Sequence, residues 1–172
     1  MMLRGAGLVC ALIVAVLGRP TAQSPVPAPV VETTSGRVSG IATRDGVAAY
    51  LGIPYAAPPV GALRWKAPQP VVPWTGVRAA AEYGPPCVQA RWAGPSPDLT
   101  LMSEECLTLN VWVPPRKQEG RLPVMGHIHG GGFFAGASGK AEPVDQVALA
   151  ARGVIVASMN YPSSSGRRWT AT

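Results

Sequence analysis

Three short runs of β-branched and apolar residues dominate the first well-patterned part of the chain, at residues 30–34, 37–41 and 47–51. Ser35-Gly36 separates the first two runs, and Asp45-Gly46 precedes the third. Such dipeptides are typical of tight turns between antiparallel strands, because glycine adopts the backbone angles that these turns need. The pattern therefore predicts a small antiparallel meander.

Proline and glycine dominate the next segment, residues 53–89. Each proline removes a backbone N–H and clashes with the preceding helical turn, so the segment is predicted to contain no helix. Trp65, Trp74 and Tyr83 recur within it. Aromatic side chains need apolar contacts, and we therefore expect an ordered loop that packs onto the body of the protein.

The pattern changes again at residues 107–113, where apolar and polar residues alternate until Pro114-Pro115 ends the predicted strand. Residues 122–129 form a second predicted strand, which runs into three glycines. A helix is expected to begin at Pro143 and to end at Gly153.

Residues 154–161 form a near-continuous apolar run, which is typical of a parallel strand buried on both faces. Strand, glycine loop, helix and buried strand together predict a βαβ unit. The expected fold class is α/β, with the antiparallel meander at the edge of a mixed sheet and one βαβ unit after it.

The N-terminus has the pattern of a targeting segment. Arg4 precedes ten consecutive apolar residues at 8–17, which are fewer than the roughly 20 that a membrane-spanning helix needs. We therefore predict a secretory signal peptide over residues 1–22, with an uncleaved anchor as the alternative, and a secreted or periplasmic protein without a stable membrane span. Residues 23–30 are predicted to be a proline-rich linker.

Charge and cysteine content narrow the function classes. The net charge of +6 comes from basic residues that mostly stand singly, whereas nucleic-acid binding needs a clustered basic surface. Removal of the signal peptide would take Cys10 with it and leave Cys87 and Cys106 in an oxidising compartment. This pair is expected to form a disulfide, and two buried free thiols are the alternative.

The glycine loop at residues 129–133 carries the candidate chemistry. Consecutive glycines allow a sharp turn and bring backbone N–H groups close to a ligand. Donors held in this way can stabilise the oxyanion formed during ester cleavage. A phosphate-binding loop is disfavoured because neither Gly-Lys-Ser/Thr nor G-x-G-x-x-G is present, and a plain flexible turn is the remaining alternative.

Further motifs surround this loop in the chain. They are GIPYA at 52–56 with PPVG at 58–61, LRW at 63–65, WTGV at 74–77, GPPCVQ at 84–89, SEECLTLNV at 103–111, HGGGF at 129–133 and NY at 160–161. With these motifs in this order, residues 31–161 resemble the N-terminal portion of the type B carboxylesterase (cholinesterase-like) family of α/β-hydrolases.

The resemblance implies several roles. They are an oxyanion hole formed by the amides of Gly131 and Gly132, a disulfide between Cys87 and Cys106, and a buried structural ion pair between Arg64 and Glu104. For the full-length family it also implies a small-molecule carboxylic ester as substrate and acyl transfer through a serine ester, without a metal or an organic cofactor.

The family's Gly-x-Ser-x-Gly nucleophile motif is not found in the 172 residues. His127 and His129 precede any such serine, so no catalytic triad can be assembled. We therefore expect a fold truncated before the nucleophile strand, an unmatched tail at residues 162–172, and a chain that is inactive alone. The strand at 154–161 is expected to have an unpaired edge where the nucleophile strand would lie.

Two other functions remain open at this stage. The same fold could act as a non-catalytic binding or adhesion module. Alternatively, His127 and His129, which stand two residues apart on one strand face, could hold a metal ion for a metal-dependent hydrolase, although the block of sequence around them offers no recognisable third ligand. The sequence sets no oligomeric state.

Overall fold

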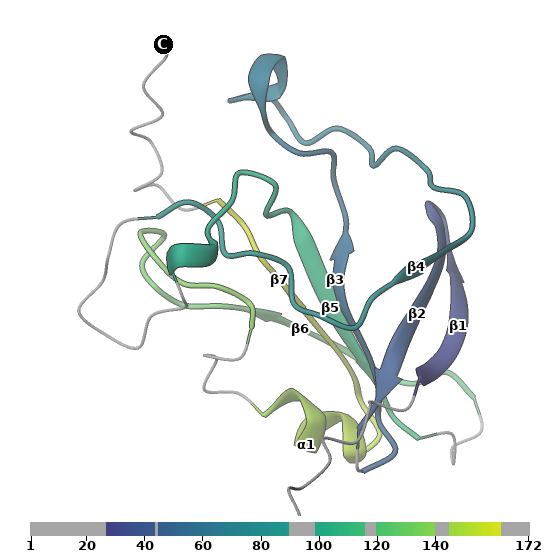
Figure 1. Cartoon of the computed structure of the whole chain (residues 1–172). Helices are drawn as coiled ribbons and strands as arrows, with labels where there is room; N and C mark the ends of the chain where they lie inside the picture. The colour runs from purple at the N-terminus through teal and green to yellow at the C-terminus, as the bar shows by residue number, and fades with distance from the viewer. Residues whose placement is uncertain (1–26, 44, 90–98, 116–119, 140–144, 163–172) are drawn as a thin grey trace, which may run out of the picture.

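The computed structural model describes residues 27–43, 45–89, 99–115, 120–139 and 145–162 (Figure 1). The predicted signal peptide at residues 1–22, the predicted helix start at Pro143 and residues 163–172 of the expected tail lie outside these ranges. No helix in the described ranges is both long and apolar enough to cross a membrane.

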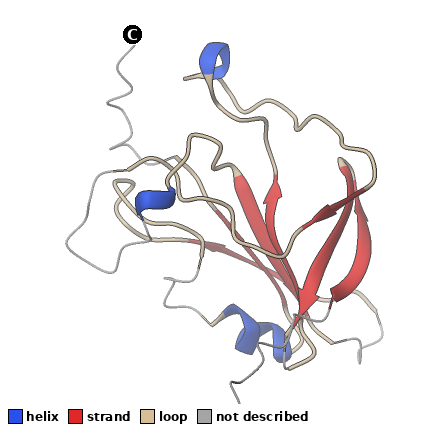
Figure 2. Cartoon of the chain, in the orientation of Figure 1, coloured by secondary structure: helices blue, strands red, loops and turns tan. Residues whose placement is uncertain are grey.

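The strands of the described structure form a single mixed sheet, with one short α-helix beside it and long loops between the strands (Figure 2). Its strands are β1 (Pro27–Thr33), β2 (Gly36–Ala42), β3 (Ala48–Pro54), β4 (Val77–Ala79), β5 (Thr108–Val113), β6 (Val124–Ile128) and β7 (Ile155–Met159). The order across the sheet is β1-β2-β3-β5-β7-β6, and β4 pairs with β2 in parallel.

The predicted meander is confirmed, because β1, β2 and β3 pair antiparallel in succession. The predicted linker at residues 23–30 is wrong in its second half, since β1 already begins at Pro27. Ala28 is buried in a cluster with Val38 and Tyr50, and the Tyr50 hydroxyl donates to the Pro29 carbonyl at 2.7 Å. Proline is tolerated here because β1 is an edge strand with an irregularity in its pairing between Pro27 and Val30.

The long loop after β3 contains no α-helix, but it does contain one 3-10 turn, Gly61–Leu63, and the short strand β4. A 3-10 turn of three residues can form here because it is short enough to lie between the prolines. The expectation that the loop packs onto the body holds for Trp74, whose indole N–H donates to the Arg37 carbonyl at 2.9 Å. Trp65 instead lies largely exposed.

The βαβ unit is also confirmed: β6 leads through α1 (Gln146–Ala151) to the parallel strand β7. The Asp145 carboxylate caps the helix by accepting from the Ala148 N–H at 2.9 Å. Gly153, with φ of 96°, follows the helix end as predicted.

The edge of the sheet was predicted on the wrong strand. β7 lies between β5, its antiparallel neighbour, and β6, its parallel neighbour, so both of its edges are paired. Within the described residues β6 pairs with β7 alone, and Val124 and Ile128 on β6 are 68% and 67% exposed. The chain leaves β6 at the outside of the sheet and returns through α1 to an inner position, which hydropathy alone does not encode.

Alternation along β5 is genuine, but the more deeply buried face is largely the polar one. Thr108, Asn110 and Trp112 are buried, whereas Leu109, Val111 and Val113 on the opposite face are only half-buried. Trp112 packs in the main apolar cluster, which has the members Val47, Ala49, Leu51, Trp112, Ala150 and Val156. Thr108 and Asn110 continue this face toward the glycine loop.

Candidate functional site

In the structure the glycine loop extends over residues 129–138 and begins where β6 ends. Its first glycines are solvent-exposed. The carbonyl of Gly131 accepts hydrogen bonds from the N–H groups of Phe134 at 2.9 Å and Ala135 at 3.2 Å. The loop is therefore a closed turn and not an open, flexible connection.

The three glycines are not equivalent. Gly131 has φ of 125°, and a Cβ atom there would lie 1.8 Å from the Ala135 carbonyl oxygen. Gly132 has φ of 59°, but an added Cβ would come no closer than 3.5 Å to Phe134. Gly130 has nothing within 4 Å of such an atom. Only position 131 therefore requires glycine for lack of space.

The amides of Gly131 and Gly132 are the predicted donors of an oxyanion hole. Within the part of the chain that the structure describes, no acceptor takes either amide hydrogen. Exposed N–H groups on a closed turn can donate to the oxygen of a tetrahedral intermediate with little reorganisation. This is the chemistry that the arrangement supports.

His129 lies at the base of the loop and is buried. Its ring stacks on Tyr161 with centroids 4.1 Å apart, and the Tyr161 hydroxyl donates to the His129 carbonyl at 2.6 Å. Its Nδ1 lies 3.0 Å from the Gly130 carbonyl oxygen. The pKa of His129 is lowered mainly by burial. The hydrogen bond with Gly130 acts in the opposite direction, and the nearby His127 lowers the pKa further.

These contacts give His129 a structural setting within the loop. Among the described residues, no group of three or more His, Cys, Asp and Glu side chains lies close enough to hold a metal ion. His127 and His129 thus come together only as a pair.

A buried polar network lies behind the loop. The Asn110 side chain accepts from the Gly52 N–H at 2.9 Å and donates to the Ser138 hydroxyl at 2.7 Å. The Ser138 hydroxyl also bonds the Ser158 hydroxyl, and the Ser138 N–H donates to the Asn160 side chain at 2.7 Å. The network joins the end of the glycine loop to β3, β5 and β7.

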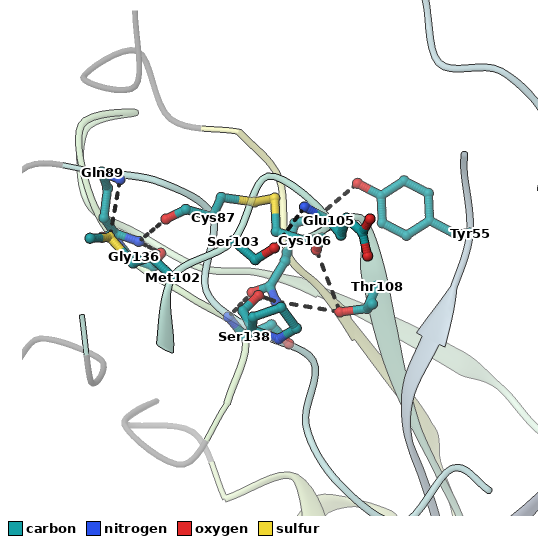
Figure 3. Close-up of a disulfide and its surroundings, with 12 residues drawn as sticks. Tyr55, Cys87, Gln89, Met102, Ser103, Glu105, Cys106, Thr108, Gly136 and Ser138 are labelled. Atoms are coloured by element: carbon teal, nitrogen blue, oxygen red, sulfur yellow. Dashed lines mark hydrogen bonds between the residues drawn. A yellow bond between two sulfur atoms is a disulfide. The ribbon is translucent and has the colours of Figure 1, made fainter. Parts of the chain in front are cut away.

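A second anchor comes from Gln89, which is buried (Figure 3). Its side-chain N–H donates to the Gly136 carbonyl at 2.8 Å, and its side-chain oxygen accepts from the Gly136 N–H at 2.7 Å. Gln89 also donates to the carbonyl of Cys87 at 3.0 Å. The glycine loop is thus held at Gly136 as well as at Ser138.

The predicted disulfide is present: Cys87 and Cys106 are bonded, with their Cα atoms 4.9 Å apart (Figure 3). Both cysteines are buried with Ala56 and Leu107. The bridge links the segment that carries Gln89 to the start of β5.

The predicted ion pair between Arg64 and Glu104 also forms, with one Arg64 nitrogen 2.6 and 2.8 Å from the two carboxylate oxygens. The pair is half-buried and not fully buried as expected, because the two side chains are 35% and 29% exposed. Arg64 follows the protruding 3-10 turn, so water reaches the pair.

Two cavities lie near the site. A cavity of about 880 Å³ is lined by apolar residues that include Trp112 and Val147, with Ser138 at its wall. One of about 660 Å³ lies between the end of β3 and the segment around Glu82 and Ser103. Neither is lined by Gly131 or Gly132, and both of these glycines are exposed among the described residues.

The long-range contacts that hold this site together were not predicted from the sequence. The motif GPPCVQ includes Gln89, and SEECLTLNV includes Asn110, but neither was given a role. The one available signal was polar residues on strand positions that must face inward, at Asn110 and Ser158.

Comparison with known proteins matches the Carboxylesterase family to residues 27–162. Fumonisin B1 esterase of Sphingopyxis macrogoltabida is 42% identical over 140 residues, covering 81% of this chain and 25% of that protein. Para-nitrobenzyl esterase of Bacillus subtilis is 45% identical over 141 residues, covering 77% and 27%. Acetylcholinesterase of Danio rerio is 41% identical over 144 residues, covering 77% and 23%.

The fold agrees with these sequence matches. A solved structure of PNB esterase superimposes with a TM-score of 0.70 at 43% identity, covering 78% of this chain and 28% of that one. The mixed sheet therefore corresponds to part of an α/β-hydrolase fold. The chain spans about a quarter of the length of the curated relatives that it matches.

Proposed function

The chain belongs to the carboxylesterase family, and from this we propose that it supplies the oxyanion-stabilising part of a carboxylic ester hydrolase. The observation that carries the proposal is the pair of exposed amides at Gly131 and Gly132, held on a closed turn without an acceptor among the described residues. An ester carbonyl oxygen that becomes negatively charged during acyl transfer would accept from both. Each such donor typically contributes about 3–4 kcal/mol to transition-state stabilisation.

The remaining catalytic groups would come from sequence outside these 172 residues. Acyl transfer of this type needs a serine nucleophile, a histidine base and an orienting acid, but no metal or organic cofactor. The Gly-x-Ser-x-Gly motif is not found in the sequence. The His129 ring stacks on Tyr161, and its Nδ1 contacts the Gly130 carbonyl oxygen. We propose that the 172-residue chain alone does not hydrolyse esters.

The substrate class follows from the same chemistry. Two neutral N–H donors recognise a carbonyl oxygen and carry no requirement for a charged acyl or alcohol group. The relatives' names specify esters as different as fumonisin B1 and para-nitrobenzyl esters. We propose that the substrate is a small-molecule carboxylic ester.

Export remains part of the proposal. The disulfide between Cys87 and Cys106 supports a secreted or periplasmic protein, because such bonds persist in oxidising compartments. Processing at about residue 22, detected by N-terminal sequencing of protein recovered outside the cytoplasm, would test it.

A chimera tests the catalytic proposal directly. Residues 27–162 would replace the matching N-terminal segment of Bacillus subtilis para-nitrobenzyl esterase, which contributes the rest of the hydrolase. We expect the chimera to hydrolyse p-nitrophenyl acetate, and the 172-residue chain alone to be inactive. Addition of a chelator should not change the rate.

Each other result has a clear meaning. A folded but inert chimera would contradict the oxyanion role and favour a non-catalytic binding module. Hydrolysis by the 172-residue chain alone would contradict the proposed division of the catalytic groups, and its loss with a chelator would point to His127 and His129.

A further inference from the structure

Gln89 is a buried side chain whose polar atoms are directed at the backbone of the glycine loop (Figure 3). It donates to the Gly136 carbonyl at 2.8 Å and accepts from the Gly136 N–H at 2.7 Å. One side-chain amide thus satisfies both backbone groups of a single residue 47 positions away. Because the N–H and the C=O of Gly136 belong to the two peptide units that flank its Cα atom, the two bonds fix the orientation of both units.

Gly136 is packed against the beginning of the loop. A Cβ atom on it would lie 2.3 Å from the His129 Nδ1 and 2.5 Å from the Gly130 carbonyl oxygen. The residue before it, Ala135, donates to the Gly131 carbonyl. An interaction that fixes Gly136 therefore also restricts Gly130 and Gly131.

Gln89 is itself held firmly. Its side chain donates to the Cys87 carbonyl at 3.0 Å, and its backbone N–H donates to the sulfur of Met102 at 3.3 Å. Cys87 is joined to Cys106 by the disulfide, directly before β5. A continuous path therefore runs from the sheet through the disulfide and Gln89 to the glycine loop.

We propose that Gln89 is the positioning residue of this loop: its side-chain amide fixes Gly136 and thereby sets the direction of the Gly131 and Gly132 N–H groups. Its catalytic meaning rests on the proposed function, in which these amides are the oxyanion donors. Gln89 touches no reacting atom and acts only through the loop.

Two substitutions separate hydrogen bonding from packing. Gln89→Met keeps a side chain of similar length but removes all three bonds. Gln89→Glu in its ionised form would direct a carboxylate at two carbonyl oxygens, whereas its protonated form can donate to the Gly136 carbonyl and accept from the Gly136 N–H. If Gln89 acts by hydrogen bonding, the loop of Gln89→Glu should regain its native arrangement as the pH falls. If Gln89 acts only by packing, the pH should make no difference. Gln69→Met, on an exposed glutamine whose side chain bonds the Ala67 carbonyl, is the matched control.

The measurement uses the 172-residue chain and NMR. Protection of the Gly136 amide against hydrogen exchange should fall in Gln89→Met by about fivefold for each lost hydrogen bond, and the amide signals of Gly131 and Gly132 should shift. The amide of Val156 in β7 should keep its protection. Gln89→Glu should lose part of this protection at neutral pH, because its carboxylate can still accept from the Gly136 N–H but faces two carbonyl oxygens. It should approach the unsubstituted chain in acid, with the unsubstituted chain measured at each pH to account for His129.

The chimera with para-nitrobenzyl esterase gives the catalytic counterpart. Gln89→Met should lower kcat by about tenfold to a hundredfold with a smaller change in KM, as expected when donors are misplaced by a fraction of an ångström. Unchanged Gly131 and Gly132 signals in Gln89→Met would overturn the proposal. If Gln89→Met does not fold, absence of acid recovery in Gln89→Glu overturns it instead. Shifted signals beside an inert parent chimera would refute the proposed function and leave the positioning role intact.

Discussion

Substituting alanine in turn at Gly130, Gly131 and Gly132 should give three different outcomes, although the residues are adjacent and chemically identical. The added methyl group meets open space at Gly130, ordinary contact at Gly132 and a backbone oxygen at Gly131. A role confined to general flexibility would predict three similar effects.

The expected magnitudes follow from the geometry. At Gly131 the new Cβ would lie 1.8 Å from the Ala135 oxygen, where ordinary contact begins at 3.4 Å, and φ of 125° is rarely adopted by residues with a side chain. The turn must open, and both donors move with it, so kcat should fall by at least about a hundredfold. At Gly132, φ of 59° costs an alanine about 1 kcal/mol of backbone strain, so kcat should fall only a few-fold. Gly130→Ala should change kcat by less than about twofold.

The assay is p-nitrophenyl acetate hydrolysis by the chimera with para-nitrobenzyl esterase, with thermal unfolding recorded for each variant. All three variants should unfold cooperatively, so that the comparison concerns the loop and not the global fold. Equal losses in all three, or a fully active Gly131→Ala, would refute the assignment of the turn as an oxyanion site.

Three further outcomes follow from other features of the structure. Reduction of the disulfide, or Cys106→Ser, should lower the free energy of unfolding by about 3 kcal/mol in urea titrations, as for a closed loop of roughly 20 residues, and Cys106→Ser should then be insensitive to reductant. Burial lowers the pKa of His129 from 6.5, so its contribution to stability should be complete above pH 6.5 and should be lost as the pH falls below that value, where the unfolded state binds the proton first. His129→Phe should flatten this part of a plot of urea midpoint against pH, and an unchanged slope would contradict the assignment. Ile128→Lys, on the exposed edge strand β6, should reduce concentration-dependent association in sedimentation velocity, whereas equal association of both proteins would show that this edge is not involved.

Local patterns predicted most of the strands. The turn dipeptides Ser35-Gly36 and Asp45-Gly46 lie at the two turns of the meander, because their backbone preferences act over two to four residues. The apolar run that contains β7 also indicated the βαβ unit. The expectation that this strand is buried on both faces is wrong, because only Val156 and Ser158 on one face are fully buried and the opposite face is half-buried. The proline-rich start of β1 was missed because Ala28 is buried by residues that lie far along the chain.

The candidate site was predictable only in part. The glycines at 131 and 132 and the cysteine pair are recognisable because their special backbone and covalent chemistry show in the residue types themselves. The role of Gln89 could not be predicted, since only the folded chain brings it to its partner Gly136. No local pattern distinguishes Gln89 from other polar residues that could make such a bond. The exposure of the Arg64–Glu104 pair depends on the path of the protruding loop, which no local pattern specifies.

The polar face of β5 has a consequence for how the sheet assembles. An aliphatic face could slide by two residues along its neighbour and still bury similar groups, because apolar packing has little directionality. Asn110 receives its hydrogen bond from Gly52, 58 residues away, and gives one to Ser138. A two-residue slip would leave these groups desolvated and unpaired, at about 1–3 kcal/mol for each. These directional bonds of Asn110 therefore favour the native register of β5 over a slipped one.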